Sequence, residues 1–381
     1  MRKGNLFLVG VASLAILASC QKEDANSNNT PTSTMRVNDN SEELNKRVTV
    51  YNEPIQLTNK RNAPDYIKVA SVAPNSIGGN QLSATSVGFK ANKVYVTYHV
   101  RGANYGAELL TFNVSDHDNP WVDQSVTNVD ADFNDLSVSS QNIWLAGGMR
   151  RGAMAWKMPL TSFNEPTGTA DWELKLESSS ANSIERVDNA SPHEIWITSG
   201  RTGGLFVADA ITPDGWLHSR AAVNNAKHFD AEGSVGVLFD GEGAVSSIDV
   251  YDLDNPYSFT TYYLNVDATL FGKNAIRVEE ASNTVFIAAG DDGVLQVDLS
   301  NGDIINEYNH GGIGLANSLD YDDDYVYVAN GADGLLIIDR ATFQLEGQYA
   351  FDGSCNYVAK NGSHIYMANG DTDGLVILEE I

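Results

Sequence analysis

Five asparagines stand at equivalent positions of a repeated pattern, and their side chains are well suited to hold a polar ligand. Each stands two residues before the first apolar residue of a predicted strand: Asn134, Asn182, Asn274, Asn317 and Asn356. The first and fourth repeats have Thr85 and Lys227 at this position. A carboxamide offers two N–H donors and an acceptor oxygen, so a ring of them could bind water, a sugar or another polar molecule. An Asn at a strand start also bonds its own loop backbone, and this structural role is the alternative.

A second candidate set lies in Gly-rich hairpin loops, and its charges are divided along the chain. The loops of the first three repeats carry Arg101, Arg150, Arg151 and Arg201. The loops of the last four repeats carry acidic residues: Asp240, Glu242, Asp291, Asp292, Asp333, Asp371 and Asp373. Turn chemistry explains most of the aspartates, but not the clustered arginines. The arginines are therefore the stronger binding candidates.

The sequence contains no recognisable motif for catalysis, metal binding or cofactor binding. We therefore predict no catalytic residue, no metal ligand and no cofactor. The sequence has no G-x-S-x-G elbow and no P-loop, and its seven His residues lack zinc spacing. The run Asp322 to Asp324 lacks the alternating pattern of a calcium loop and predicts a solvated turn. Cys355, in an apolar strand, predicts a buried structural thiol. Acidic loop residues could still pair as the two carboxylates of a polysaccharide hydrolase or lyase, which is the enzymatic alternative.

The elements that position these residues are predicted by a strand pattern repeated seven times. Its clearest copy is Val326 to Asp339, where alternating residues, an Asn-Gly-Ala-Asp-Gly loop and the apolar run Leu335 to Ile338 predict two strands joined by a hairpin. Related apolar cores recur about every 40 to 50 residues, a period typical of propeller blades. They begin at Val94, Ile143, Ile195, Val235, Val285, Val326 and Ile365. The predicted fold is all-β, a seven-bladed β-propeller of four-stranded blades. Six blades is the alternative, because Gly236 replaces an aromatic residue in the fourth repeat.

The N-terminal strand Tyr66 to Val72 is predicted to complete the last blade, which otherwise has three strands before the chain ends at Ile381. Closure of this kind removes exposed sheet edges. The predicted propeller domain covers residues 46–381, with Val48 to Leu57 as an extra strand interrupted by Pro54. In such a ring the Arg-bearing and Asn-bearing loops share one face, at the mouth of the central channel. The charge division would make this face dipolar and orient a charged partner.

The first 45 residues predict export and membrane attachment. Arg2 and Lys3 precede a short apolar segment that ends in Leu17-Ala18-Ser19-Cys20. This tetrapeptide resembles a bacterial lipobox, which implies a signal peptide at 1–19, lipidation of Cys20 and a flexible tether over 20–45. Gln21 to Asp24 resembles the acidic export signal of surface lipoproteins in the Bacteroidetes group. The chain is thus expected in the outer membrane, lipid-anchored and exposed at the cell surface.

The formal net charge of −26 predicts an acidic surface that does not suit binding to nucleic-acid phosphates. The runs Gly334 to Asp339 and Gly374 to Leu378 resemble the LVIVD-repeat family of bacterial surface β-propellers. That resemblance implies a surface location but no reaction. We therefore expect a non-catalytic propeller that binds a protein, a polar small molecule or a glycan at the channel mouth. A surface polysaccharide hydrolase or lyase, and a nutrient-capture lipoprotein that partners an outer-membrane transporter, are the alternatives.

Overall fold

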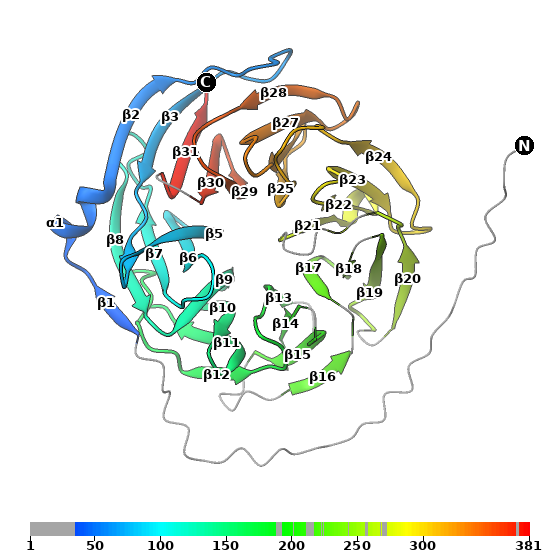
Figure 1. Ribbon diagram of the computed structural model, residues 1–381, viewed down its shortest axis with the longest axis horizontal. Coiled ribbons are helices and arrows are strands. Elements are labelled where there is room, and N and C mark those ends of the chain that lie inside the picture. The colour runs from blue at the N-terminus through cyan, green and yellow to red at the C-terminus, as the bar shows by residue number, and fades with distance from the viewer. Residues whose placement is uncertain are drawn as a thin grey trace, which may run out of the picture.

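The computed structural model forms a ring of seven β-sheets around a central channel (Figure 1). The described residues are 35–187, 193–200, 202–210, 217–221, 223, 225–242, 244–255, 258–266, 268, 273–370 and 373–381. The predicted seven-bladed β-propeller is confirmed, and each blade contains four consecutive antiparallel strands or their equivalent.

The strands of each blade run outward from the channel in chain order. Blade 1 contains β5 (Asn80–Lys90), β6 (Lys93–Val100), β7 (Ala107–Asn113) and β8 (Trp121–Asn128). Blade 2 contains β9 (Ala131–Val138), β10 (Asn142–Met149), β11 (Gly152–Pro159) and β12 (Trp172–Lys175). Blade 3 contains β13 (Ser183–Val187), β14 (Glu194–Thr198), β15 (Leu205–Asp209) and β16 (Leu217–Ala221). Blade 4 contains β17 (Ala226–Glu232), β18 (Val235–Glu242), β19 (Val245–Asp252) and β20 (Phe259–Tyr263).

The remaining blades repeat this order, with a change in the last. Blade 5 contains β21 (Ile276–Glu279), β22 (Thr284–Ala288), β23 (Val294–Asp298) and β24 (Ile304–Tyr308), with the 3-10 turn η2 (Glu280–Ser282). Blade 6 contains β25 (Ser318–Tyr321), β26 (Tyr325–Ala329), β27 (Leu335–Asp339) and β28 (Leu345–Tyr349). Blade 7 contains β29 (Cys355–Asn361), β30 (His364–Asn369), β31 (Leu375–Glu380) and, from the N-terminal region, β3 (Tyr66–Val72).

Blade 6 shows why the apolar runs of the sequence become middle strands. Leu335, Leu336, Ile337 and Ile338 on β27 are all at most 1% exposed. Leu336 and Ile338 pack in the cluster that joins blades 5 and 6, whereas Leu335 and Ile337 pack in the cluster that joins blades 6 and 7. A strand covered on both faces needs apolar residues at every position. The hairpin before it relies on Gly334, whose φ is +82° and whose place a Cβ would occupy only 2.2 Å from the Tyr349 carbonyl oxygen.

Ring closure follows the sequence prediction. β3 pairs antiparallel with β31, and Tyr66 lies opposite Glu380. The Gly at position 236 does not remove a blade, because the Phe229 ring of the adjacent β17 fills the space that a side chain at 236 would need. A Cβ on Gly236 would lie 2.7 Å from this ring.

Residues 35–63 add a strap on the outside of the ring, which the sequence only partly predicts. β1 (Arg36–Asn38) pairs with β8 of blade 1, and β2 (Val48–Pro54) pairs with β3 of blade 7 (Figure 1). Between them lie α1 (Ser41–Leu44) and the 3-10 turn η1 (Asn45–Arg47), and blade 1 also carries the short β4 (Ser76–Ile77). Further along, Thr58 pairs with Gln348 of blade 6.

The strap therefore contacts blades 1, 7 and 6, and residues 35–45, which were predicted to belong to the tether, lie against blade 1. The segment is held because β1 pairs with the edge strand β8, the Leu44 side chain is buried against blade 1, and the Asn45 side chain bonds the Val122 backbone. Residues 1–34, which include the predicted signal peptide and Cys20, lie outside the described residues. Within the described part of the chain, none of the helices has the length and apolar character needed to cross a membrane.

Candidate functional site

β-bulges place a polar residue of four inner strands at the channel. The pairing register shifts around Thr85 on β5, Asn134 on β9, Lys227 on β17 and Asn356 on β29. Each of these residues is the extra, unpaired residue of its bulge. A bulge bends the strand and redirects a side chain. Here it directs residues of the predicted register toward the channel mouth.

A cavity of about 510 Å³ lies at this mouth and has lining residues from all seven blades. Four predicted asparagines line it, namely Asn134, Asn182, Asn317 and Asn356. Thr85, Lys227 and Arg101 also line it, together with residues that the sequence did not single out: Ser83, His99, Ser178, Ser179, Ser180 and Lys273. Among its described lining residues are three cations and no carboxylate. The face shared by the hairpin loops and strand starts therefore carries a cavity.

The fifth asparagine differs from the other four. Asn274 is fully buried, donates through Nδ2 to the Ala288 carbonyl of its own blade, and does not line the cavity. Its φ of +50° takes it out of the extended conformation of a strand. The preceding residue, Lys273, enters the cavity instead.

The asparagine amides join neighbouring blades. Asn134 donates to the Ala181 carbonyl over 2.8 Å, Asn182 to Ala226 over 3.0 Å, Asn317 to Cys355 over 3.2 Å, and Asn356 to Ala84 over 2.8 Å. In each case the acceptor belongs to the next blade. Thr85 makes the same connection with its hydroxyl, which donates to the Phe133 carbonyl over 2.9 Å. The backbone partners are thus in the next blade, rather than in each residue's own loop.

Lys273 spans the channel at the base of the cavity. Its Nζ donates to the Thr85 and Asn134 carbonyls, each over 3.1 Å, and to Asp135 Oδ1 over 2.9 Å. It also lies 4.5 Å from the centre of the Tyr357 ring. Three acceptors around Nζ match the three N–H groups of an ammonium. Blade 5 is thereby tied to blades 1, 2 and 7 across the ring.

Asp135 is buried and Lys273 is half-buried, and the electrostatics of the pair follow from this. Burial lowers the pKa of Lys273, and the Asp135 carboxylate offsets part of that effect. Burial alone would raise the pKa of Asp135, but the Lys273 charge and hydrogen bonds bring it below the ordinary value. The second oxygen of Asp135 accepts from the Ile184 amide over 3.1 Å. Each oxygen of Asp135 therefore already accepts a hydrogen bond, and the residue is only 4% exposed.

A second charged layer lies deeper in the channel. Arg277 lies 3.4 Å from Asp230 and 3.7 Å from Asp320, and donates to the Tyr357 hydroxyl. Burial raises the pKa of Asp230 to about 6 despite Arg277. Burial likewise lowers the pKa of His228 to about 3, so its imidazole is neutral at pH 7. These groups do not line the cavity; Asp230, Arg277 and Asp320 are half-buried, and His228 is buried.

The sequence contains a pattern that could have predicted these ion pairs, three residues beyond the positions of the asparagines. Asp230, Arg277 and Asp320 each stand three residues after the asparagine-register position of their own repeat. A cation at one register position, with acids at the same position in the repeats before and after it, indicates ion pairing around a channel. Lys273 gave no comparable signal, because its partners lie on the far side of the ring.

Of the predicted arginines that the structure describes, Arg150 and Arg151 do not line the cavity, whereas Arg101 does. Arg101 lines the cavity and donates from Nε to Ser83 over 3.3 Å. Arg151 pairs with Glu173 of the outer strand β12 at 2.9 Å, away from the mouth. Arg150 is exposed and does not line the cavity. Arg201 lies outside the described residues. Of the three described arginines, only Arg101 is positioned to contact a ligand in the channel mouth.

The acidic loop residues are likewise occupied by local structure. Asp333 accepts from the Gly314 amide over 2.7 Å, and Asp373 pairs with Lys68 over 3.0 Å. Asp240 accepts from Ser247, and burial raises its pKa to about 6. Asp291 and Asp292 do not line the cavity. Asp371 and the side chain of Glu242 lie outside the described residues.

The remaining sequence predictions concern a turn and a thiol. Asp322 accepts from the Asp324 and Tyr325 amides, as expected for a turn. Cys355 is a buried free thiol, and burial raises its pKa. In the described part of the chain, no group of three or more His, Cys, Asp or Glu residues is placed to hold a metal ion.

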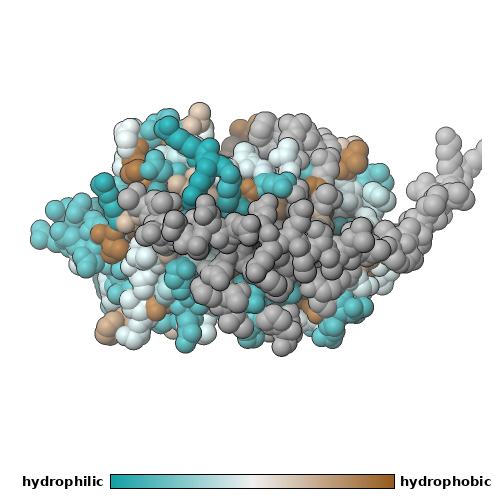
Figure 2. All heavy atoms as spheres, turned by 90° about the horizontal axis from the view of Figure 1, so that it is seen from below, coloured by the Kyte–Doolittle hydropathy of each residue, from teal (hydrophilic) through white to brown (hydrophobic). Residues whose placement is uncertain are grey.

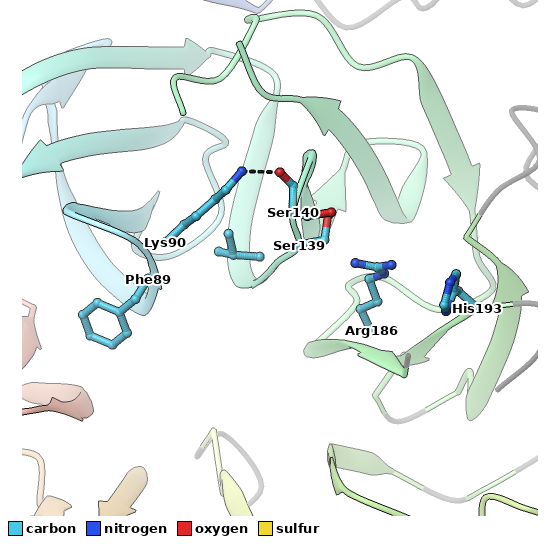
Figure 3. Close-up of a pocket in the computed structure, with 7 residues that line it drawn as sticks. Phe89, Lys90, Ser139, Ser140, Arg186 and His193 are labelled. Atoms are coloured by element: carbon cyan, nitrogen blue, oxygen red, sulfur yellow. Dashed lines mark hydrogen bonds between the residues drawn. The ribbon is translucent and has the colours of Figure 1, made fainter. Parts of the chain in front are cut away.

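A second hollow of about 430 Å³ lies at the opposite ends of the inner strands. Lys90, Ser139, Ser140, Arg186 and His193 line it, and Lys90 donates to the Ser140 carbonyl (Figure 3). One of its lining residues, His193, follows residues 188–192 in the chain, which lie outside the described residues. In Figure 2 the coloured residues of the flank are mostly hydrophilic, with a few apolar residues among them. The mouth cavity is therefore the better-defined candidate site.

Comparison with known proteins supports the fold alone. No protein-family model and no curated protein sequence matches this chain. The crystal structure of the WD40 β-propeller domain of Doa1 is similar, with a TM-score of 0.55 and 14% identity over 80% of this chain and 95% of that chain. The computationally designed Ika8 protein is similar with a TM-score of 0.53 and 14% identity over 87% of this chain and 98% of that chain. At this identity the likeness extends to architecture, without any transfer of function.

Proposed function

We propose that the protein is a lipid-anchored cell-surface binding propeller that holds a polar ligand in its channel mouth. The observation that carries the proposal is the cavity of about 510 Å³, with polar lining residues from seven blades. Its volume lies within the range of small-molecule sites. The resemblance to LVIVD-repeat surface proteins and to surface lipoproteins of the Bacteroidetes group supports the proposed location. A role in nutrient capture beside an outer-membrane transporter would be one form of this function.

The composition of the cavity favours binding over polysaccharide cleavage. Most glycoside hydrolases need two carboxyl groups on either side of the bond that is broken. The described lining residues include neither Asp nor Glu. Asp135 directly follows the lining residue Asn134 in the chain. Its two oxygens accept hydrogen bonds from Lys273 and from the Ile184 amide. The asparagines and serines instead supply neutral hydrogen-bonding groups, and the imidazole on the wall, that of His99, shares a hydrogen bond with Asn134 Oδ1.

The binding function is tested by a ligand screen on the full-length protein in detergent. A ligand that binds only the folded state at 100 times its Kd should stabilise it by about 2.7 kcal/mol, seen as a rise in Tm. Competition and substitution at the mouth would then locate the site. If polar small molecules, glycans and peptides all leave the Tm unchanged and none binds, the proposal fails.

The Cys20→Ser variant should lose membrane attachment, because the thiol that would carry the lipid is absent. We expect the wild-type protein in the membrane fraction and the variant mainly in soluble fractions, with no incorporation of labelled fatty acid. The Cys355→Ala variant is the control, since it removes the buried thiol and should remain membrane-bound. Continued fatty-acid labelling of Cys20→Ser would contradict the lipidation prediction.

A further inference from the structure

The orientation of the asparagine carboxamides at the mouth is fixed by their partners. The nitrogen and oxygen of an Asn side chain are ordinarily assigned from the hydrogen-bond network. Asn182 Nδ2 and Asn317 Nδ2 each face a backbone carbonyl of the next blade, at 3.0 and 3.2 Å. A carbonyl can only accept, so the nitrogen must face it. The carboxamide oxygen of each residue is left for another partner.

These two oxygens are available to a ligand. Asn182 and Asn317 are half-buried and line the cavity. Within the described part of the chain, neither Oδ1 accepts a hydrogen bond. Asn356 differs, because its Oδ1 already accepts from the Ser354 hydroxyl over 2.9 Å. The mouth thus presents two acceptors, on blades 3 and 6, that are held in place by inter-blade bonds and call for a donor.

The donor must suit the charge of the cavity. Ammonium groups, hydroxyls and amide N–H groups can all donate to a carboxamide oxygen. Arg101, Lys227 and Lys273 line the same cavity, and no described lining residue is acidic. The described lining of the cavity therefore offers a cationic donor no carboxylate as a counter-charge. Hydroxyls and amide N–H groups remain. Ser179 and Ser180 on the cavity wall favour hydroxyls, because a serine hydroxyl can both donate to and accept from another hydroxyl, whereas an amide N–H can only donate.

We propose that the channel mouth binds a short saccharide, whose hydroxyls donate to Asn182 Oδ1 and Asn317 Oδ1. This inference rests on the proposed binding function and specifies its ligand class. Because Lys273 spans the channel at the base of the cavity, the saccharide enters from the mouth and does not thread through the ring. Both acceptors belong to residues whose amides join blades, so the site is preorganised before the ligand arrives.

Blade 1 shows how to remove these acceptors without breaking the ring. Thr85 makes the equivalent inter-blade bond with its hydroxyl and carries no carboxamide oxygen. Asn182→Thr and Asn317→Thr should therefore keep a donor for the next blade and lose the acceptor that faces the cavity. Neither asparagine has a positive φ, so the β-branched side chain fits the backbone.

The test begins with an array of neutral, amino and acidic oligosaccharides probed with the full-length protein in detergent. The tightest saccharide is then measured by calorimetry against Asn182→Thr/Asn317→Thr. We expect the double variant to bind at least about tenfold more weakly, roughly 1.4 kcal/mol, with an unchanged Tm. Asn356→Thr is the matched control, because its oxygen is already occupied. Its binding should weaken less than about threefold, which is about 0.7 kcal/mol.

Two outcomes overturn the ligand class while leaving a binding function in place. One is a saccharide that binds the double variant as tightly as the wild type. The other is that no saccharide on the array binds, while a peptide or a non-hydroxylated anion binds the wild type and fails to bind the Arg101→Ala variant. An absence of binding by every class tested would remove both the inference and the proposed function. Should the double variant unfold, Asn182→Thr and Asn317→Thr are measured singly, and full binding by both contradicts the inference.

Discussion

Replacement of Lys273 with methionine is expected to destabilise the propeller by about 3–5 kcal/mol, the usual cost of removing one partner from a buried ion pair. The change leaves Asp135, which is 4% exposed, without its cation inside the ring. It also removes the donor that the Thr85 and Asn134 carbonyls share. Methionine keeps most of the side-chain volume, so the loss reports charge and hydrogen bonding. Urea unfolding followed by tryptophan fluorescence measures it.

The pH dependence of this loss distinguishes an ion pair from simple packing. In the folded wild-type protein the pKa of Asp135 is lowered. Its contribution to the free energy of unfolding is therefore fully present above the unfolded-state pKa of about 3.9, and it is lost as the pH falls through the lower folded-state pKa. In Lys273→Met, burial raises the pKa of Asp135, and stability falls as pH rises. The difference between the two proteins should therefore be largest near pH 7 and shrink toward pH 4.

Two companion variants make the result specific. Lys273→Met/Asp135→Asn replaces the pair by neutral groups and should recover most of the lost stability, since the new carboxamide oxygen would still accept from the Ile184 amide. Lys175→Met changes an exposed lysine on β12 and should alter stability by less than about 0.5 kcal/mol. A Lys273→Met protein as stable as the wild type at pH 7 would show that the pair does not hold the ring together.

The parts of the structure that were predictable are those governed by local patterns. Apolar alternation and Gly-rich loops predicted the blades around Val326 to Asp339, because strand period and hairpin geometry depend on neighbouring residues. The repeated register of Asn134, Asn182, Asn317 and Asn356 placed them together at the channel mouth, since equivalent residues of a ring face the same axis. Closure of the ring by Tyr66 to Val72 was predictable because the last repeat lacks a fourth strand and this N-terminal strand belongs to no other repeat.

The parts that were not predictable depend on contacts between distant residues. Lys273 bonds Asp135 from 138 positions away in the chain, so no sequence window contains both. The positive φ of Asn274 is a backbone property that exchanges one lining residue for its neighbour, and the residue type alone permits either conformation. Arg151 was predicted to bind a ligand because of its charge and its place in a hairpin loop. It pairs instead with Glu173, which the packing of the outer strand brings beside it.

The strap is the other long-range feature, and Arg47 fastens it to the ring. Its guanidinium pairs with Glu108 of β7 through two parallel bonds, of 2.7 and 2.9 Å, and Nε donates to the Ala73 carbonyl over 2.8 Å. The Glu108 side chain is 0% exposed and that of Arg47 is 16% exposed. Ser125 donates to the same carboxylate over 2.5 Å. This is a buried, bidentate pair between the N-terminal segment and blade 1, beside the point where the ring closes.

Replacement of Arg47 with methionine should therefore cost about 3–5 kcal/mol, because Glu108 would remain buried and, among the described residues, would keep only the Ser125 hydroxyl as a donor. Arg47→Lys should give an intermediate loss, since an ammonium keeps the charge but not the planar two-bond geometry. Lys46→Met, which removes a charge from the exposed neighbouring residue, is the matched control. Thermal unfolding measures the stability, and limited proteolysis of residues 35–63 reports release of the strap. If Arg47→Met and Lys46→Met unfold at the same temperature and are cleaved at the same rate, the strap is held by its backbone pairing with β3 and β8 rather than by this ion pair.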